Sequence, residues 1–191
     1  MESRLFQALK AFKGADGCEA NLFEEFKKIA EVAFFSGYFL INGGCKDEYK
    51  LKLTCIEFYY HEDDGNIKDK RKYLKGKDEF GYALGAVCPN PSGVDVLFDD
   101  PQKKYHASFL IRGYKAIEPG KKEWENNEKR KDWAPHDFWY DLYGGANMLS
   151  NGKFSIEWID ETDETPGYAE PIHRINIDDN RLWGFKRVEK L

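Results

Sequence analysis

The chain has 191 residues, of which 41% are hydrophobic and 16% aromatic, so it is long enough to bury one substantial core and we expect a single domain over residues 1–191. Its formal net charge of −5 excludes a wholly basic nucleic-acid binder, although a local basic patch remains compatible with that charge. No run of about 18 apolar residues occurs, and residues 1–10 carry no apolar signal segment, so we expect a cytoplasmic protein with no membrane partner.

Helical spacing is concentrated before residue 36. Residues 2–13 carry apolar side chains at helical intervals, namely Leu5, Phe6, Leu9 and Phe12. A second helix is expected to begin near Asn21, an N-cap residue with Glu24 three positions later, and to end near Ser36 and Gly37.

Strand patterns dominate the remainder of the chain. We expect strands at 38–42, 49–60, 92–98, 105–114, 154–159, 173–177 and 182–188. Asn42-Gly43-Gly44 is a turn into the second of these strands, and 92–114 looks like a β-hairpin. Residues 118–137 are expected to form a helix followed by a loop, and 160–171 an acidic loop. The fold class is therefore α+β, with N-terminal helices packed on a curved, mainly antiparallel sheet.

One carboxylate, Glu57, lies inside the strand at 49–60. In that strand apolar and polar residues alternate, and a regular register would place Glu57 on the apolar side with Leu53 and Cys55. A carboxylate on an apolar face tends to serve as an acid, a base or an electrostatic stabiliser. The alternative is a strand that has twisted or bulged, which leaves Glu57 solvated or paired with a lysine.

Two further charged residues, Asp95 and Arg112, lie inside otherwise apolar strands of the predicted hairpin. A buried charge needs a partner, so each of them either takes part in a structural ion pair, reaches the rim of the sheet, or belongs to a functional site.

The cysteines and the acidic cluster give no metal signature. Cys18, Cys45, Cys55 and Cys88 are widely spaced with no C-x-x-C pair, so we expect reduced thiols rather than a zinc ribbon or a disulfide framework. His61-Glu62-Asp63-Asp64 matches no metal-binding loop. We therefore expect no metal ion and no other cofactor.

Four segments, in this order along the chain, carry a family resemblance. The first, 30–41, is a helix followed by a strand, and the second, 56–63, is a strand end in which a glutamate, a spacer and a tyrosine precede an acidic loop. The third, 107–119, is a strand that ends in an arginine and is followed by Glu-Pro. The fourth is the terminal pair of strands at 171–177 and 182–185. Together they resemble, distantly, the alkyladenine (3-methyladenine) DNA glycosylase superfamily, whose members flip a damaged purine out of DNA and cut its N-glycosidic bond.

The resemblance implies a role for each matched residue. Glu57 would be the general base that activates water, and Arg112 would bind the DNA or hold the pocket. Tyr59 would stack on the flipped base, with Tyr60 and Tyr82 as further rings near the site. Asp95 stands where the family carries an asparagine that guards the pocket, and Lys68 stands where the family carries a histidine.

Duplex DNA is the partner that the resemblance implies. The most basic stretch, 68–77, would supply phosphate contacts through Lys68, Lys70, Arg71 and Lys72, although such a run is also typical of a solvated loop. Two function classes follow: a glycosylase acting on alkylated or deaminated purines, or a non-catalytic module on the same fold that binds a small molecule, a nucleic acid or a protein. Convergence of Glu57, Tyr59 and Arg112 on a cavity distinguishes them.

Overall fold

The computed structural model describes residues 2–16, 18–42, 48–69, 84–90, 93–117, 125–126, 155–175 and 177–190. Within these residues the chain forms two helices and nine strands: α1 (Arg4–Lys10), α2 (Glu19–Phe35), β1 (Gly37–Asn42), β2 (Glu48–Glu62), β3 (Leu84–Asn90), β4 (Gly93–Phe98), β5 (Tyr105–Ile117), β6 (Glu125–Asn126), β7 (Ser155–Asp160), β8 (Gly167–Ile172) and β9 (Gly184–Glu189). All described strand pairings are antiparallel. The predicted α+β fold with N-terminal helices on an antiparallel sheet is confirmed.

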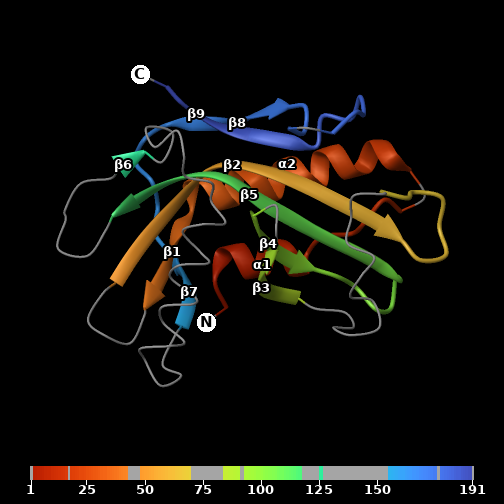
Figure 1. The fold of residues 1–191 in the computed structure, drawn as a ribbon, viewed down its shortest axis with the longest axis horizontal. Helices are drawn as coiled ribbons and strands as arrows, with labels where there is room; N and C mark the ends of the chain where they lie inside the picture. The colour runs from red at the N-terminus through yellow and green to blue at the C-terminus, as the bar shows by residue number, and fades with distance from the viewer. Residues whose placement is uncertain are drawn as a thin grey trace.

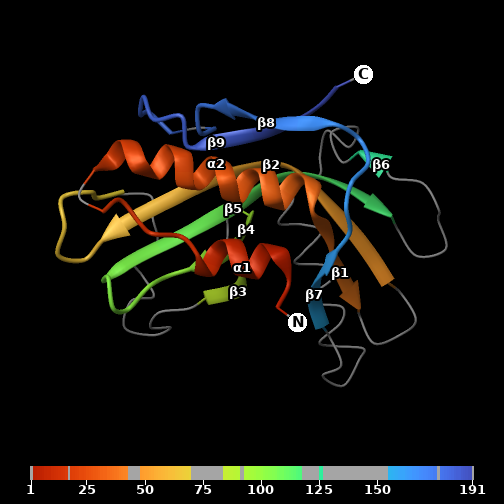
Figure 2. The same cartoon turned by 180° about the vertical axis from the view of Figure 1, so that it is seen from behind.

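The sheet branches at β2. Its main order is β3-β4-β5-β2-β1-β7, while β9 also pairs with β2 and carries β8 on its far side. Both helices lie on the same face of the curved sheet, behind it in Figure 1 and in front of it in Figure 2, and β8 and β9 run along the upper rim beside α2. Neither described helix, α1 or α2, lies over the opposite face of β2 and β5.

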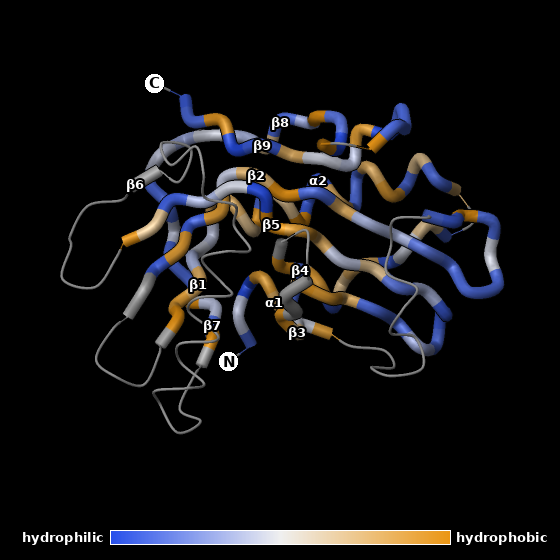
Figure 3. Tube along the Cα trace, in the orientation of Figure 1, coloured by the Kyte–Doolittle hydropathy of each residue, from blue (hydrophilic) through white to orange (hydrophobic). Residues whose placement is uncertain are grey.

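Aromatic rings hold α2 on the sheet. The fully buried Phe26 ring stacks on Phe58 of β2 with centroids 4.4 Å apart, on Phe12 at 5.6 Å, and meets the edge of Trp183 at 5.4 Å. In Figure 3 apolar stretches of α1, α2, β2 and β5 gather where the helices meet the sheet. The described helices include none long and apolar enough to cross a membrane.

The second helix begins earlier than its sequence suggests. Its first residue is Glu19 and its N-cap is Cys18, whose side chain makes no capping hydrogen bond. Asn21, the predicted N-cap, instead donates from Nδ2 to the carbonyl of Ala15 at 3.1 Å. The predicted end of the helix is confirmed, because α2 stops at Phe35 and Ser36 follows it.

Two predictions for the C-terminal half are wrong. β8 occupies part of the predicted acidic loop, and residues 173–175 and 177, predicted as strand, have no regular structure. β8 is an edge strand in which only Ala169 is buried, so its sequence shows no apolar alternation. An edge strand also tolerates a proline, here Pro171. In the predicted helix at 118–137, the described residues 125–126 form β6, and the others lie outside the described residues.

The thiols are described only in part. Cys18 and Cys55 are free. Cys45 and the side chain of Cys88 lie outside the described part of the chain, as does the predicted turn at 43–44.

Paired irregularities in β2 and β5 shift the side-chain register of both strands. On β2 the helix-facing residues are spaced by two except between Leu53 and Ile56, and on β5 the matching gap lies between Ile111 and Tyr114. Register shifts occur at these positions, as in a β-bulge. Since each gap spans three residues, every side chain that follows it on the strand changes face relative to an unbroken alternation.

Gly113 permits this irregularity. A Cβ atom at Gly113 would lie 2.8 Å from Thr54 Oγ1 and 3.1 Å from Cys55 Cβ, which is closer than such contacts allow. The backbone at Gly113 does not have a positive φ, so the constraint is one of space.

We expect Gly113→Ala to lower the free energy of unfolding by about 1–3 kcal/mol, because the added methyl group overpacks the bulge. Thr54→Ala in the same chain should restore part of the loss, since it removes the oxygen that the new methyl group meets. Urea denaturation of the wild type, both single variants and the double variant measures this coupling. Strict additivity of the two substitutions would contradict the assigned contact.

Candidate functional site

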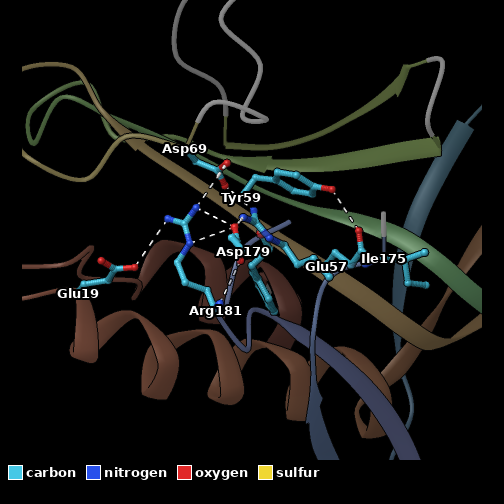
Figure 4. A network of polar contacts seen from close by, with 9 residues as sticks. Glu19, Glu57, Tyr59, Asp69, Ile175, Asp179 and Arg181 are labelled. Carbon is cyan, nitrogen blue, oxygen red and sulfur yellow. Dashed lines mark hydrogen bonds and ion pairs between the residues drawn. The ribbon is translucent and has the colours of Figure 1, made fainter. Parts of the chain in front are cut away.

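The buried carboxylate of Glu57 is the centre of the candidate site. Its side chain is 0% exposed, and three donors reach it. The hydroxyl of Tyr59 and Nε of Arg112 donate to Oε2 at 3.1 and 2.8 Å, and the backbone N–H of Ile175 donates to Oε1 at 2.5 Å. Figure 4 shows Tyr59 and Ile175 at the Glu57 carboxylate. The structure therefore brings together Glu57, Tyr59 and Arg112, as expected, but they meet at an enclosed carboxylate and not at a cavity open to a positive surface.

The β2 irregularity decides which way Glu57 points. After the register shift, Ile56, Phe58 and Tyr60 face the helices, so Glu57 lies on the opposite face of the sheet. The expectation that Glu57 shares the side of Leu53 is wrong for this reason. The bulged alternative is confirmed, but the partner of Glu57 is an arginine and the carboxylate is enclosed.

Hydrogen bonding and charge fix the protonation state of Tyr59. Burial raises the pKa of its hydroxyl well above the ordinary value, and the negative charge of Glu57 raises it further. Tyr59 therefore remains protonated and donates to the carboxylate. Arg112 supplies the positive charge without which the buried carboxylate would be strongly destabilising.

Asp95 lies on the same face as Glu57. In the register of the sheet, Glu57 of β2 is opposite Leu110 of β5, which in turn is opposite Asp95 of β4. Residues directly opposite one another on neighbouring strands share a face, so the two acidic residues are separated by two strand spacings, about 10 Å.

Tyr60 does not join this group. It belongs to the helix-facing core, where its hydroxyl accepts from the backbone N–H of Ala15 at 3.2 Å and donates to Glu62 at 3.1 Å. Successive residues of a strand point to opposite faces, so Tyr60 cannot line a pocket around Glu57. Its predicted role at the site is wrong.

Of the four basic residues predicted to contact DNA, the structure describes Lys68. Nζ of Lys68 donates to the carbonyls of Glu62 and Asp63, so this lysine caps the turn after β2. It does not contact Glu57. Lys70, Arg71 and Lys72 lie outside the described residues, and so does Tyr82.

A surface pocket of about 360 Å³ opens at the far end of β2. Residues 62 and 64–67 and residues 102–104 line it. Two of its charged groups, Lys104 and Asp64, form an ion pair at 2.7 Å. This pocket does not include Glu57.

The sequence analysis missed a buried arginine next to the site. Arg174 lies in the β8–β9 segment, which we define as residues 173–183, with residue 176 outside the described residues. The Arg174 side chain is 0% exposed. Nη1 donates to the carbonyl of Phe58 at 3.2 Å and to Asp69, and Nη2 donates to Asp179. Nothing in the sequence pattern distinguishes this arginine from a solvated one.

Arg181 extends the charged network toward α2. Nη2 of Arg181 lies 2.9 Å from Asp179, and Nη1 lies 3.7 Å from Glu19 at the start of α2 (Figure 4). Two guanidinium groups contact the Trp183 ring, with Arg181 at 4.1 Å and Arg174 at 5.2 Å from its centroid. These cation–π contacts and ion pairs fasten the β8–β9 segment over the end of β2.

Asp179 gives this network a defined pH dependence. Burial alone would raise its pKa, but hydrogen bonds from Arg181 and Arg174 outweigh burial and lower the pKa below its usual range. A lowered folded-state pKa means that Asp179 stabilises the protein above its unfolded pKa of about 3.9, and that this stabilisation is lost as the pH falls below that value.

We therefore expect Asp179→Asn to be less stable than the wild type at pH 7, with a difference that shrinks as the pH falls below about 4. Urea denaturation at pH 7, 5, 4 and 3 measures it, and taking the difference between the two proteins removes the other titrating groups. A difference that is the same at every pH would show that the charge of Asp179 contributes nothing.

No family model matches the chain, and neither the curated proteins nor the solved structures contain a match to it. The functional argument therefore rests on the geometry of the site.

Proposed function

We propose that the chain is a DNA glycosylase that hydrolyses the N-glycosidic bond of an alkylated or deaminated purine. One observation carries the proposal: Tyr59 and Arg112 both donate to a single oxygen of Glu57. Arg112 lies on a different strand, 55 residues from Glu57. The resemblance had assigned these three residues to one site, and their convergence supports that assignment.

The chemistry needs a carboxylate with room for a water molecule. A carboxylate has about four acceptor positions, and three donors occupy three of them in Glu57. Among the donors of the described residues, Ile175 N–H alone binds Oε1, so one acceptor position is left on that oxygen. A water molecule hydrogen-bonded there would give a proton to Glu57 while its oxygen attacks C1′ of the sugar.

The bond changes balance in one step. The new bond joins the water oxygen to C1′, the C1′–N9 bond breaks, and its electron pair leaves with the purine. Positive charge develops on the sugar in an oxocarbenium-like transition state, which the anionic Glu57 stabilises as it accepts the proton. Arg112 and Tyr59 hold the carboxylate in place, and the ring of Tyr59 is the surface available for stacking on the flipped base.

Access to Glu57 requires movement. The carboxylate has no exposed surface and the Tyr59 ring is 7% exposed, so neither a purine nor its sugar reaches them in this arrangement. DNA binding must therefore displace side chains or backbone around Glu57.

The second candidate function is a non-catalytic binding module. The same enclosure favours it, because a carboxylate with three donors and no solvent contact satisfies every requirement of a structural ion pair. On this alternative the Glu57–Arg112 pair only stabilises the sheet, and any ligand binds elsewhere on the fold.

Base release from defined duplexes distinguishes the two. We expect the wild type to leave abasic sites, revealed by alkaline strand cleavage, in duplexes containing hypoxanthine or methyladenine. Glu57→Gln should lower the single-turnover rate by about 10²–10⁴-fold, because a neutral amide cannot accept the proton. Glu62→Gln is the matched control, because it makes the same chemical change on the same strand. Glu62 accepts a hydrogen bond from Tyr60, which lies on the face opposite Glu57.

Folding must be checked, because Glu57→Gln leaves Arg112 without a counter-charge. Near-ultraviolet circular dichroism establishes that each variant retains its packed aromatic core before its rate is compared. Salt-dependent DNA binding without base release by the wild type would favour the binding module. Equal rates for folded Glu57→Gln and wild type would remove Glu57 as the base.

A further inference from the structure

The amide of Ile175 holds a position that its own side chain does not explain. Its N–H bonds to Glu57, which is 118 residues away in sequence, yet the Ile175 side chain is 45% exposed and so is not anchored by burial. The segment that carries it has no regular structure. Another residue must therefore hold this amide against the carboxylate.

The neighbouring residue, Arg174, provides that anchor. Its guanidinium group donates to the backbone carbonyl of Phe58, the residue that follows Glu57 in β2. The arginine thereby links the backbone next to Ile175 to the backbone next to Glu57. The Arg174 side chain is fully buried, and β2 is paired with β5 on one side and β9 on the other. The link between Arg174 and β2 therefore leaves the Ile175 amide little freedom.

Two carboxylates and the rings of Tyr59 and Trp183 determine where the Arg174 guanidinium group lies. Asp69 and Asp179 accept from Nη1 and Nη2, and both are largely buried, with side chains 1% and 19% exposed. The guanidinium carbon also lies 5.0 Å from the centroid of the Tyr59 ring. Arg174 therefore contacts one face of the ring whose hydroxyl binds Glu57, so that only the other face is available to a base.

We propose that Arg174 is a positioning residue for Glu57: it fixes the Ile175 N–H on Oε1 and the plane of the Tyr59 ring, and Asp69 and Asp179 hold it in place. The inference rests on the proposed function as far as catalysis is concerned. The positioning itself is a property of the free protein. Arg174 acts through Ile175 and Tyr59 and contacts neither water nor substrate in this role.

Hydrogen exchange of the Ile175 amide tests the positioning without DNA. We expect exchange at Ile175, followed by NMR, to be at least about tenfold faster in Asp179→Asn than in the wild type. Asp163→Asn is the matched control, because Asp163 also accepts from a buried arginine, Arg187, at 2.7 Å, and this pair is separate from the contacts of Glu57 and Arg174. Exchange at Ile175 in the control should equal that in the wild type.

Single-turnover base release at saturating DNA tests the consequence for catalysis. Arg174→Met should lower this rate by about 10²-fold with DNA affinity unchanged, since small misplacement of catalytic groups costs that much. Arg174→Lys, which keeps the charge and loses the forked geometry, should recover part of the rate. Where Arg174→Met does not fold, Asp179→Asn and Arg174→Lys carry the same comparison.

The two hypotheses fail separately. Ile175 exchange that is unchanged in folded Asp179→Asn and Arg174→Lys overturns the positioning role, whatever the activity. A parallel loss of DNA affinity and rate would also overturn it, because it would show a binding or general structural role. If the wild type releases no base, the proposed function fails, and the exchange measurement alone decides whether Arg174 positions Ile175.

Discussion

The candidate site depends on the register shift shared by β2 and β5. Without the gap between Leu53 and Ile56, Glu57 would point toward α2, into the stack of rings around Phe26. A carboxylate there would meet only apolar surface and would destabilise the fold by several kcal/mol. The shift turns Glu57 to the other face, where Arg112, which lies within the matching gap of β5, reaches it. One irregularity thus preserves the core and creates the ion pair.

The buried charges beyond Glu57 follow from the same geometry. An ion pair on the face without helices still has to be enclosed, and the β8–β9 segment covers it. That segment carries its own buried cation, Arg174, which needs the counter-charges of Asp69 and Asp179. Each buried charge therefore requires a partner, and within the described residues the pairs extend from Arg174 through Asp179 and Arg181 to the half-exposed Glu19. Removing one partner would leave an uncompensated charge, so the network stabilises one arrangement against its alternatives more than it adds stability.

The sequence predicts those features that rest on apolar periodicity or on local motifs. The two helices, the β4–β5 hairpin and β9 have clear patterns, and the Glu57, Tyr59 and Arg112 triad follows from short motifs in adjacent strands. β8 was not predictable, because its residues pair through the backbone and bury only Ala169. The role of Tyr60 was mistaken because Glu57 and Tyr60 are three residues apart in a regular stretch of β2, so simple alternation puts them on opposite faces whether or not the bulge precedes them. Arg174 was missed because its partners lie 105 residues before and 5 residues after it.

A carboxylate that is held this firmly combines two requirements that oppose each other. Three donors fix the orientation of Glu57, which favours catalysis because a group that is already oriented needs no reorganisation as the transition state forms. The same donors also occupy acceptor positions that a water molecule would otherwise use. Tyr59 and Arg112 belong to paired strands and both donate to Oε2, whereas Ile175 lies outside the paired strands and donates to Oε1. The strand ladders therefore hold two of the three donors in place. The third donor depends on the contacts of Arg174, so the orientation of Oε1 rests on that one side chain.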